Sequence, residues 1–251
     1  MIEVRNISKS FADNKVLNNV STTFEQGQTS LIIGRSGSGK TVLIKCIVGL
    51  HNVDEGEVIF DNRVFTDMAF REKKEIRKEI GMLFQGGALF DSMTTEENVV
   101  FPLNMFTDMS YEEKLERVNF CLKRVNMENA NDLYPSELSG GMKKRVAIAR
   151  AIALNPKYLF CDEPNSGLDP MTAIVIDNLI KEITDEYNIT TIVNTHDMNS
   201  VMRISDKIIF IHEGNKWWEG TKDEILHTDN KEINDFVFSL EFIRKLKKEQ
   251  E

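Results

Sequence analysis

The amino-acid sequence predicts an α/β fold, in which a mainly parallel β-sheet is covered by helices. Short apolar runs typical of buried strands alternate with segments of helical periodicity along the chain. A glycine-rich loop, residues 34–39, separates one such run from a dense apolar segment. The chain has 251 residues and 41% hydrophobic content, enough to bury one sizeable core. Because strands that alternate with helices pair in parallel, we expect one α/β domain with an inserted subdomain.

The first third of the chain is rich in predicted strands. Residues 2–4 and 20–24 have the alternation of edge strands, and residues 29–33 form a short apolar strand. Residues 41–50 hold too many apolar side chains for a surface helix, so we expect a buried helix there. The other elements predicted here are a strand and turn over 56–63, a charged surface helix over 70–79, and a buried strand over 81–85.

The middle of the chain is predicted to be a helical insertion. Ser110 is suited to cap a helix over 109–125, because Glu113 three residues later completes a capping box. The pattern then returns to a strand over 157–161, an amphipathic helix over 171–187, a strand over 190–194 and a hairpin over 208–220. We therefore expect a single domain, 1–251, composed of a core with an antiparallel β edge over 1–86 and 154–228, an α-helical subdomain over 87–153, and a helical tail over 229–251.

Composition and charge exclude several classes of protein. A net charge of −9 and a pI of about 5.1 argue against sequence-independent binding of nucleic acid. Cys46, Cys121 and Cys161 are odd in number and far apart, so we expect buried free thiols rather than disulfides or a zinc site. The first residues lack the features of a signal peptide, and no apolar run approaches the ~18 residues of a membrane span. We expect a cytoplasmic protein, with any membrane spans supplied by another polypeptide.

One loop carries a specific chemical signal. It fits the pattern G-x-x-x-x-G-K-[ST], and its residues are Gly34, Arg35, Ser36, Gly37, Ser38, Gly39, Lys40 and Thr41. The glycines let backbone N–H groups approach phosphates, while Lys40 is placed to meet the β- and γ-phosphates and Thr41 to bind Mg²⁺. Its position between an apolar strand and a helix is the context that this motif requires.

Three further segments are informative in combination. Asp162 ends an apolar strand, where a carboxylate can hold Mg²⁺ through its water shell. Ser139 precedes a predicted helix that starts with Gly140 and Gly141, and a helix N-terminus attracts anions. His196 follows another apolar strand, a place where a lone histidine is more often structural.

Taken in this order, these segments resemble those of the ATP-binding cassette (ABC) ATPase family, over almost the whole chain. The resemblance implies ATP and Mg²⁺ as cofactors and an active site shared by two copies joined head to tail. It makes Glu163 the base or water-orienting group, His196 the contact to the γ-phosphate, and Gln85 the residue that senses Mg²⁺ and the attacking water.

The same resemblance implies further nucleotide contacts. Ser139, Gly140 and Gly141 would contact the γ-phosphate held by the other copy, with Met142 where many members have glutamine. Phe11 matches the aromatic residue that stacks on adenine, although core packing is an alternative for a single aromatic side chain. Asp169 closes the segment 166–169 that follows Glu163, and we include it among the nucleotide-binding residues.

Within the family, the segments 84–94, 97–99, 101–103, 138–147 and 195–198 are similar to those of Mla/Mce-type phospholipid transporters. This implies a lipid cargo, a transmembrane permease on the inner face of the cell membrane, and an Mce-type substrate-binding protein as a further partner. Asn165 stands where such proteins more often have threonine, and Trp217-Trp218 has no counterpart in the pattern. The alternatives are another ABC importer or exporter, a non-transporting ABC protein, and an ATP-binding switch without turnover.

Two apolar features remain open at this point. Leu89 and Phe90 are hypothesised to receive a short helix of the permease, and burial beneath the insertion is the alternative. The tail has apolar residues at helical spacing, which cover either a second subunit or its own domain. These residues are Ile233, Phe236, Val237, Leu240, Ile243 and Leu246.

Overall fold

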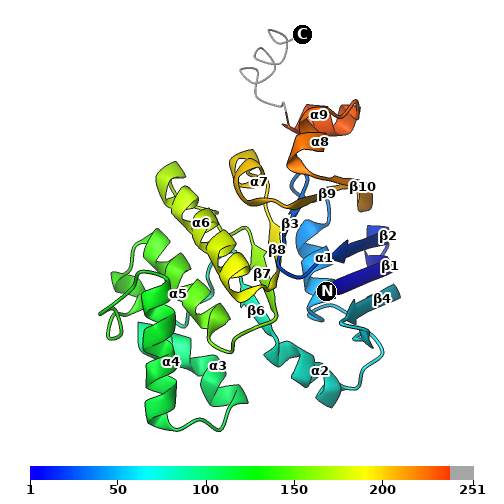
Figure 1. The fold of residues 1–251 in the computed structure, drawn as a ribbon. Helices are drawn as coiled ribbons and strands as arrows, with labels where there is room; N and C mark the ends of the chain where they lie inside the picture. The colour runs from blue at the N-terminus through cyan, green and yellow to red at the C-terminus, as the bar shows by residue number, and fades with distance from the viewer. Residues whose placement is uncertain (238–251) are drawn as a thin grey trace.

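The computed structural model describes residues 1–237 of the chain, which fold around two β-sheets (Figure 1). The larger sheet has the strand order β10-β9-β3-β8-β7-β6. Its strands are β3 (Thr29–Ile33), β6 (Ile80–Leu83), β7 (Tyr158–Asp162), β8 (Thr190–Asn194), β9 (Lys207–His212) and β10 (Asn215–Gly220). The β9–β10 hairpin pairs antiparallel and the other described pairs of this sheet are parallel, so the predicted mixed core is confirmed.

The smaller sheet is antiparallel and has the strand order β2-β1-β4-β5. Its strands are β1 (Ile2–Phe11), β2 (Asn14–Phe24), β4 (Glu55–Phe60) and β5 (Arg63–Val64). β1 and β2 are much longer than the strands predicted over 2–4 and 20–24, and β1 has a neighbour on each side rather than an edge. Register shifts along β1 interrupt the period-two alternation, which is why the sequence pattern underestimated both strands.

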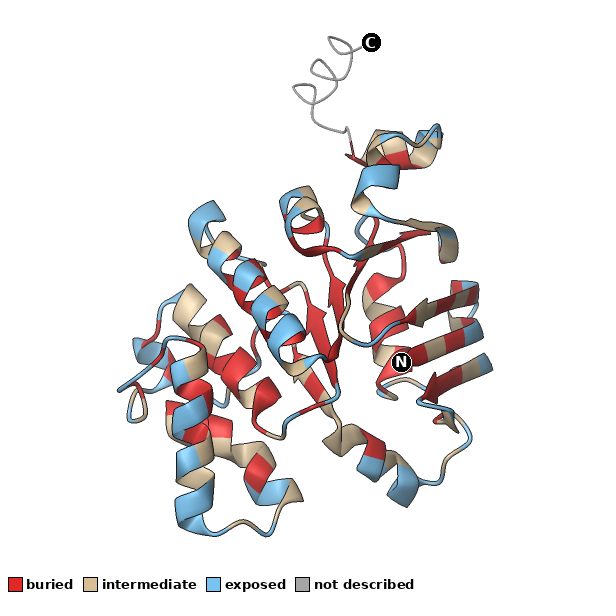
Figure 2. Cartoon of the chain, viewed as in Figure 1, coloured by how far each residue is buried: buried red, intermediate tan, exposed pale blue. Residues whose placement is uncertain are grey.

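Helices cover both faces of the larger sheet (Figure 2). They are α1 (Lys40–Ile47), α2 (Phe70–Lys78), α3 (Thr95–Phe106), α4 (Tyr111–Arg124), α5 (Gly140–Ile152), α6 (Pro170–Tyr187), α7 (Met198–Ile204), α8 (Lys222–Leu226) and α9 (Lys231–Val237), with a 3₁₀ turn at Pro135–Glu137. Ile32 packs with α1 and the smaller sheet, while Leu31 and Ile33 pack with α5 and α6. The short strands are apolar throughout because both of their faces are buried.

The ends of two helices differ from the predictions. α1 stops at Ile47 instead of residue 50, because Gly49 has a φ of +72° and redirects the chain, which leaves Leu50 55% exposed. α3 was not predicted as a separate helix, since Pro102 lies inside it. By contrast, α4 begins after Ser110 with the predicted capping box.

The structure shows which of the apolar residues at 89–90 and in the tail are buried. Leu89 packs partly buried against the core, whereas Phe90 is 41% exposed and its ring lies 4.8 Å from that of Phe101. Ile233 and Val237 are buried against the main core, so this part of the tail covers its own chain, and residues 238–251 lie outside the described part. All three cysteines are buried and free, as expected.

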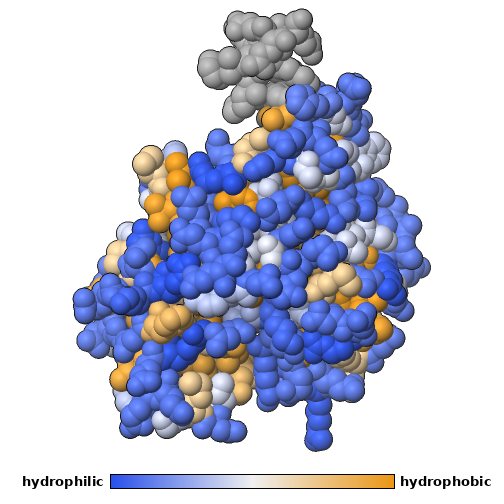
Figure 3. Space-filling model, in the orientation of Figure 1, coloured by the Kyte–Doolittle hydropathy of each residue, from blue (hydrophilic) through white to orange (hydrophobic). Residues whose placement is uncertain are grey.

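The surface in Figure 3 is mostly hydrophilic, with small hydrophobic groups of atoms, one of them over α3 and α4. Met105 on α3 and Tyr111 on α4 are among the exposed apolar residues. Within residues 1–237, no helix combines the length and apolar content needed to cross a membrane.

Candidate active site

The glycine loop connects β3 to α1, at the carboxyl edge of the larger sheet (Figure 1). Gly34 has a φ of +148°, and a Cβ atom there would lie 2.2 Å from the carbonyl oxygen of Ile211. Gly39 has a φ of +106° and would place a Cβ atom 2.9 Å from the carbonyl oxygen of Val16. Both glycines are therefore required by backbone conformation and by close approach. Arg35, Ser36 and Gly37 form the exposed tip of the loop, and Ser38 is buried beneath it.

Lys40 turns back over this loop. It is only 6% exposed, and its Nζ donates hydrogen bonds to the carbonyl oxygens of Gly34 (2.8 Å) and Arg35 (2.9 Å). Burial lowers the pKa of the ammonium group, and the nearby carboxylates of Glu163 and Asp162 oppose that shift. The lysine is thus folded back over the glycine loop and held by two of its carbonyl oxygens.

Thr41, Asp162 and Asn194 form a polar cluster below the loop. Thr41 Oγ1 lies 3.2 Å from Asp162 Oδ1, and Asn194 Nδ2 donates to both of these oxygens, at 3.1 Å to Thr41. Asp162 ends β7 and Asn194 ends β8, so the parallel register brings them side by side. Asn194 is fully buried, and sequence reasoning missed it because an asparagine that ends a strand gives no signal by itself.

The cluster suits a Mg²⁺ ion that is also held by phosphates and water. One carboxylate and one hydroxyl lie adjacent, and the buried Oδ1 of Asn194 has no partner among the described groups. Within residues 1–237 there is no set of three or more His, Cys, Asp or Glu side chains able to enclose a metal. Mg²⁺ is commonly bound through one or two carboxylates together with substrate phosphates, which agrees with this arrangement.

Glu163 and His196 meet directly above this cluster. His196 Nδ1 lies 2.8 Å from Glu163 Oε2 and 3.0 Å from Oε1. Glu163 follows the last residue of β7 and has a φ of +50°, and its N–H donates to the carbonyl oxygen of Asn194 at 2.9 Å. This left-handed turn gives Glu163 a different direction from Asp162. The two residues named from the sequence for γ-phosphate chemistry are therefore placed together.

Gln85 is held through its backbone rather than its side chain. Its side chain is exposed, and its carbonyl oxygen accepts a hydrogen bond from Lys144 Nζ. Lys144 lies on α5, is 5% exposed, and reaches the carbonyl oxygen of Glu163 at 3.4 Å. Burial lowers the pKa of this ammonium group. Arg150, two turns further along α5, donates to the carbonyl oxygens of Gly87 and Ala88, each at 2.7 Å.

Sequence reasoning missed Lys144 and Arg150. Basic residues within a helix usually belong to its solvent-exposed face. Lys144 and Arg150 differ from such residues because they lie on the side of α5 that packs against the protein, and that position is the signal that could have identified them. Their role depends on contacts with residues about 60 positions earlier, which no local pattern shows. Together they attach the segment 85–88 to α5.

The segment 139–141 lies apart from the glycine loop of its own chain. Ser139 caps α5 by accepting the N–H of Met142 at 3.3 Å. A Cβ atom on Gly141 would lie 2.6 Å from Thr172 in the first turn of α6, which places this segment beside α6. In Figure 1, α5 and α1 stand on opposite sides of β7 and β8. The structure therefore does not bring residues 139–141 together with Lys40 within one chain.

Asp169 and Phe11 occupy different surroundings. Asp169 caps α6: its carboxylate accepts the N–H groups of Met171 and Thr172, each at 3.0 Å, and the hydroxyl of Thr172. These hydrogen bonds hold the pKa of Asp169 below its ordinary value.

Phe11 ends β1 and is 42% exposed, with its ring 5.2 Å from that of His51, so it is not part of the core.

The fold and these groups define a class of protein. A glycine loop after a central strand, a buried lysine on that loop, and a threonine beside an aspartate at the end of a neighbouring strand characterise a P-loop nucleoside triphosphatase.

Comparisons with known proteins narrow this class. The family model described as ABC transporter matches residues 17–166. The methionine import ATP-binding protein MetN of Clostridium tetani is 43% identical over 211 residues, which cover 84% of this chain and 66% of that protein. The intermembrane phospholipid transport system ATP-binding protein MlaF of Haemophilus influenzae is 38% identical over 237 residues, covering 94% of this chain and 90% of that protein.

Solved structures agree with this result. A dimeric, post-hydrolysis structure of the ATP-binding cassette MJ0796 with ADP and Pi has a TM-score of 0.81 and 35% identity, over 88% of this chain and 98% of that one. The structure of cbiO1 from Clostridium perfringens has a TM-score of 0.84 and 28% identity, over 98% of both chains. The chain belongs to the ABC transporter family. It is the subunit of such a transporter that binds and hydrolyses ATP.

Proposed function

We propose that two copies of this chain bind two ATP molecules between them, with each site made from both copies. One copy contributes Lys40, Thr41 and Asp162, and the other presents the N-terminus of α5 at Ser139. The separation of residues 139–141 from Lys40 within one chain is the observation that supports this arrangement. The N-terminus of α5 has unpaired N–H groups and a partial positive charge, which suit a γ-phosphate.

The residues around the phosphates would act mainly by position and charge. The backbone of residues 34–39 and Lys40 would cradle the β- and γ-phosphates, in place of the carbonyl contacts that Lys40 now makes. Thr41 and Asp162 would hold Mg²⁺, with Gln85 at its outer side, and the ion would neutralise charge on the phosphates. Phe11, 42% exposed at the end of β1, would stack on adenine, and Asp169 would act from the start of α6, next to the segment 139–141.

Hydrolysis would depend on Glu163 and His196. The Glu163 carboxylate would accept a proton from the attacking water or orient that water, while His196, now paired with Glu163, would turn to the γ-phosphate. Phosphoryl transfer relies on positioning and electrostatics, so displacement of either group is costly. Lys144 and Arg150 would serve as positioning residues, because they tie the Gln85 segment and the Glu163 turn to the helix that starts after Ser139.

The experiment that tests this assignment compares the ATPase rates of wild type and Glu163→Gln. We expect Glu163→Gln to bind ATP with near wild-type affinity and to hydrolyse it at least about 100-fold more slowly. The matched control is Glu186→Gln, which changes an exposed carboxylate on α6. A Glu163→Gln protein that hydrolyses ATP at the wild-type rate would remove Glu163 from the reaction.

We further propose that the chain works at the cytoplasmic face of a membrane, on a permease that docks at Phe90 and Phe101. Phe90 is exposed next to the segment held by Arg150, so a helix seated there would press on the Gln85 region. We expect Phe90→Glu to abolish co-purification with the permease while ATP binding by the isolated subunit is retained. Intact co-purification would contradict the docking site.

For the cargo, we propose a phospholipid or related lipid, handled with an Mce-type substrate-binding protein. The segments around Gln85 and Met142 and the match to MlaF over 90% of its length support this proposal. Methionine is the second candidate, supported by the 43% identity to MetN of Clostridium tetani. ATPase stimulation of the purified transporter by phospholipid vesicles, compared with stimulation by methionine and its binding protein, separates the two.

A further inference from the structure

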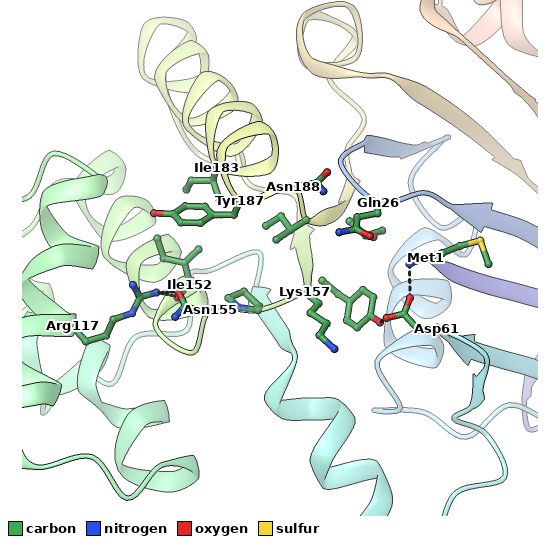
Figure 4. A pocket seen from close by; sticks show the side chains of 14 residues that line it. Met1, Gln26, Asp61, Arg117, Ile152, Asn155, Lys157, Ile183, Tyr187 and Asn188 are labelled. Carbon is green, nitrogen blue, oxygen red and sulfur yellow. Dashed lines mark hydrogen bonds and ion pairs between the residues drawn. The ribbon is translucent and has the colours of Figure 1, made fainter.

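A cavity of about 280 Å³ lies at the edge of the larger sheet opposite the ATP site (Figure 4). It is surrounded by α4, the end of α5 with the loop that follows it, the end of α6, and the turn at Gln26. The first residues of β7 and β8, Tyr158 and Thr190, form part of its lining. Because Asp162 and Asn194 are the last residues of these strands, the whole length of the sheet separates the cavity from the catalytic cluster.

Four helices and strands connect the ATP site with this cavity. Each has a proposed site residue at or next to one of its ends, and a cavity-lining residue at or near its opposite end. Their site residues are Ser139 before α5, Asp162 in β7, Asp169 before α6 and Asn194 in β8. Their cavity residues are Ile152, Tyr158, Tyr187 and Thr190. A molecule bound here would therefore contact the far ends of elements from both halves of the ATP site.

One side of the cavity is apolar. Figure 4 shows the ring of Tyr187 lying close to the side chains of Ile152 and Ile183, which come from α5 and α6. Ile183 and Ile152 are 0% and 2% exposed, so they lie behind the half-buried ring of Tyr187, and that ring is the surface that an aromatic or branched apolar group can contact. The volume is near the lower end, about 300 Å³, of cavities that hold small organic ligands.

The rim of the cavity carries positive charge. Arg117 on α4 uses Nε and Nη2 to bond the carbonyl oxygens of Ala153 and Ile152 and the side chain of Asn155, and Nη1 has no hydrogen bond to any other group of residues 1–237. Lys157 stands on the other side, is 60% exposed, and lies 3.4 Å from Glu79. The carboxylate at this rim, Asp61, already accepts the hydroxyl of Tyr158 and the amino group of Met1.

We propose that this cavity is a regulatory site for a small aromatic carboxylate, whose ring packs against Tyr187 and whose carboxylate meets Lys157. Such a ligand joins α4 and α5 to α6 and the sheet, and so changes the position of Ser139 relative to Asp162. Binding rests on the cavity alone, whereas the regulatory effect rests on the proposed function.

The first experiment measures binding to the full chain without nucleotide, by isothermal titration with 2-naphthoate. We expect one saturable site, at least tenfold weaker binding to Lys157→Glu, and no binding to Ile183→Trp, which fills the cavity. Lys123→Glu is the matched control, because Lys123 is 75% exposed on α4 and pairs with Glu128 instead of lining the cavity. The neutral analogue 2-naphthalenemethanol should bind at least tenfold more weakly.

Two outcomes overturn the site. The first is no saturable binding of 2-naphthoate to a wild-type chain that unfolds cooperatively. The second is equal binding to wild type, Ile183→Trp and Lys157→Glu. Stronger binding of 2-naphthyl phosphate than of 2-naphthoate would contradict the choice of a carboxylate.

The second experiment measures regulation. Saturating 2-naphthoate should change the ATPase rate of wild type at least twofold and leave that of Ile183→Trp unchanged. Binding without any change in rate overturns the regulatory role but not the site. Glu163→Gln tells the two proposals apart. It should lose ATPase activity, as the proposed function requires, and still bind 2-naphthoate, as the cavity site requires.

Discussion

Lys144→Met tests whether a buried cation on α5 positions the catalytic segments. The substitution keeps the length and apolar stem of the side chain but removes the hydrogen bonds from Nζ to the carbonyl oxygens of Gln85 and Glu163. A hydrogen bond from a charged donor contributes about 1.5–3 kcal/mol. If this energy positions the two segments during hydrolysis, its loss lowers kcat about 10- to 100-fold, at roughly 1.4 kcal/mol per factor of ten.

The effect on stability should be much smaller. Lys144 is 5% exposed, so folding of the wild-type chain includes the cost of removing an ammonium group from water. The methionine side chain of the variant has no such cost, and this gain offsets the two lost hydrogen bonds. We expect the free energy of unfolding to change by about 1 kcal/mol or less.

The assay is steady-state ATP hydrolysis with urea unfolding as the parallel measurement. We expect kcat to fall with KM for ATP nearly unchanged, and Lys144→Arg to recover most of the rate because it restores a cationic donor. Lys143→Met is the matched control, since Lys143 is a neighbouring and more exposed lysine on α5. A Lys144→Met enzyme with kcat within about twofold of wild type would refute the reasoning.

Two further predictions concern stability. Hydrogen bonds from Arg63, at 2.9 and 2.7 Å, hold the pKa of Glu79 below its ordinary value of 4.5. This contribution to stability is therefore present above pH 4.5 and is lost as the pH falls below it. Glu79→Gln should cost about 1 kcal/mol at pH 7, a modest value because Arg63 is 34% exposed, and should flatten the acid dependence measured by urea unfolding. An unchanged acid dependence would show that the pair is not responsible. Asn165→Ala removes a 2.7 Å hydrogen bond to the fully buried carboxylate of Asp177, so urea unfolding should show a loss of about 2 kcal/mol, and a loss below about 0.5 kcal/mol would contradict this role of Asn165.

Local patterns predicted the parts of the site that depend on local structure. The glycine loop, the Ser110 cap of α4 and the Ser139 cap of α5 each require only a few consecutive residues, and the structure contains all three. The strands at 29–33 and 190–194 were also predicted with their observed bounds, because burial on both faces makes them continuously apolar. The resemblance to ABC ATPases then brought Gln85, Glu163 and His196 into the candidate site.

Other parts could not be predicted because they depend on distant contacts. Asn194 belongs to the site only through pairing of β8 with β7, and Lys144 only through packing of α5 beneath the Gln85 segment. The same holds for Asn165, whose amide donates a hydrogen bond to Asp177, twelve residues later. In β1, the bulges broke the alternation from which its length would have been inferred.

The most direct test of the divided active site is the mass of Glu163→Gln in solution, measured by light scattering with and without MgATP. Our account predicts that MgATP converts this protein from one copy to two. It also predicts that Glu163→Gln combined with Gly140→Glu still binds ATP but remains a single copy, because a carboxylate at the N-terminus of α5 repels the partner's γ-phosphate. A Cβ atom on Gly140 comes no closer than 3.4 Å to Leu168 of its own chain, so the substitution does not force α5 away from α6. A single-copy mass for Glu163→Gln with saturating MgATP bound, together with wild-type hydrolysis by Gly140→Glu alone, would contradict the account.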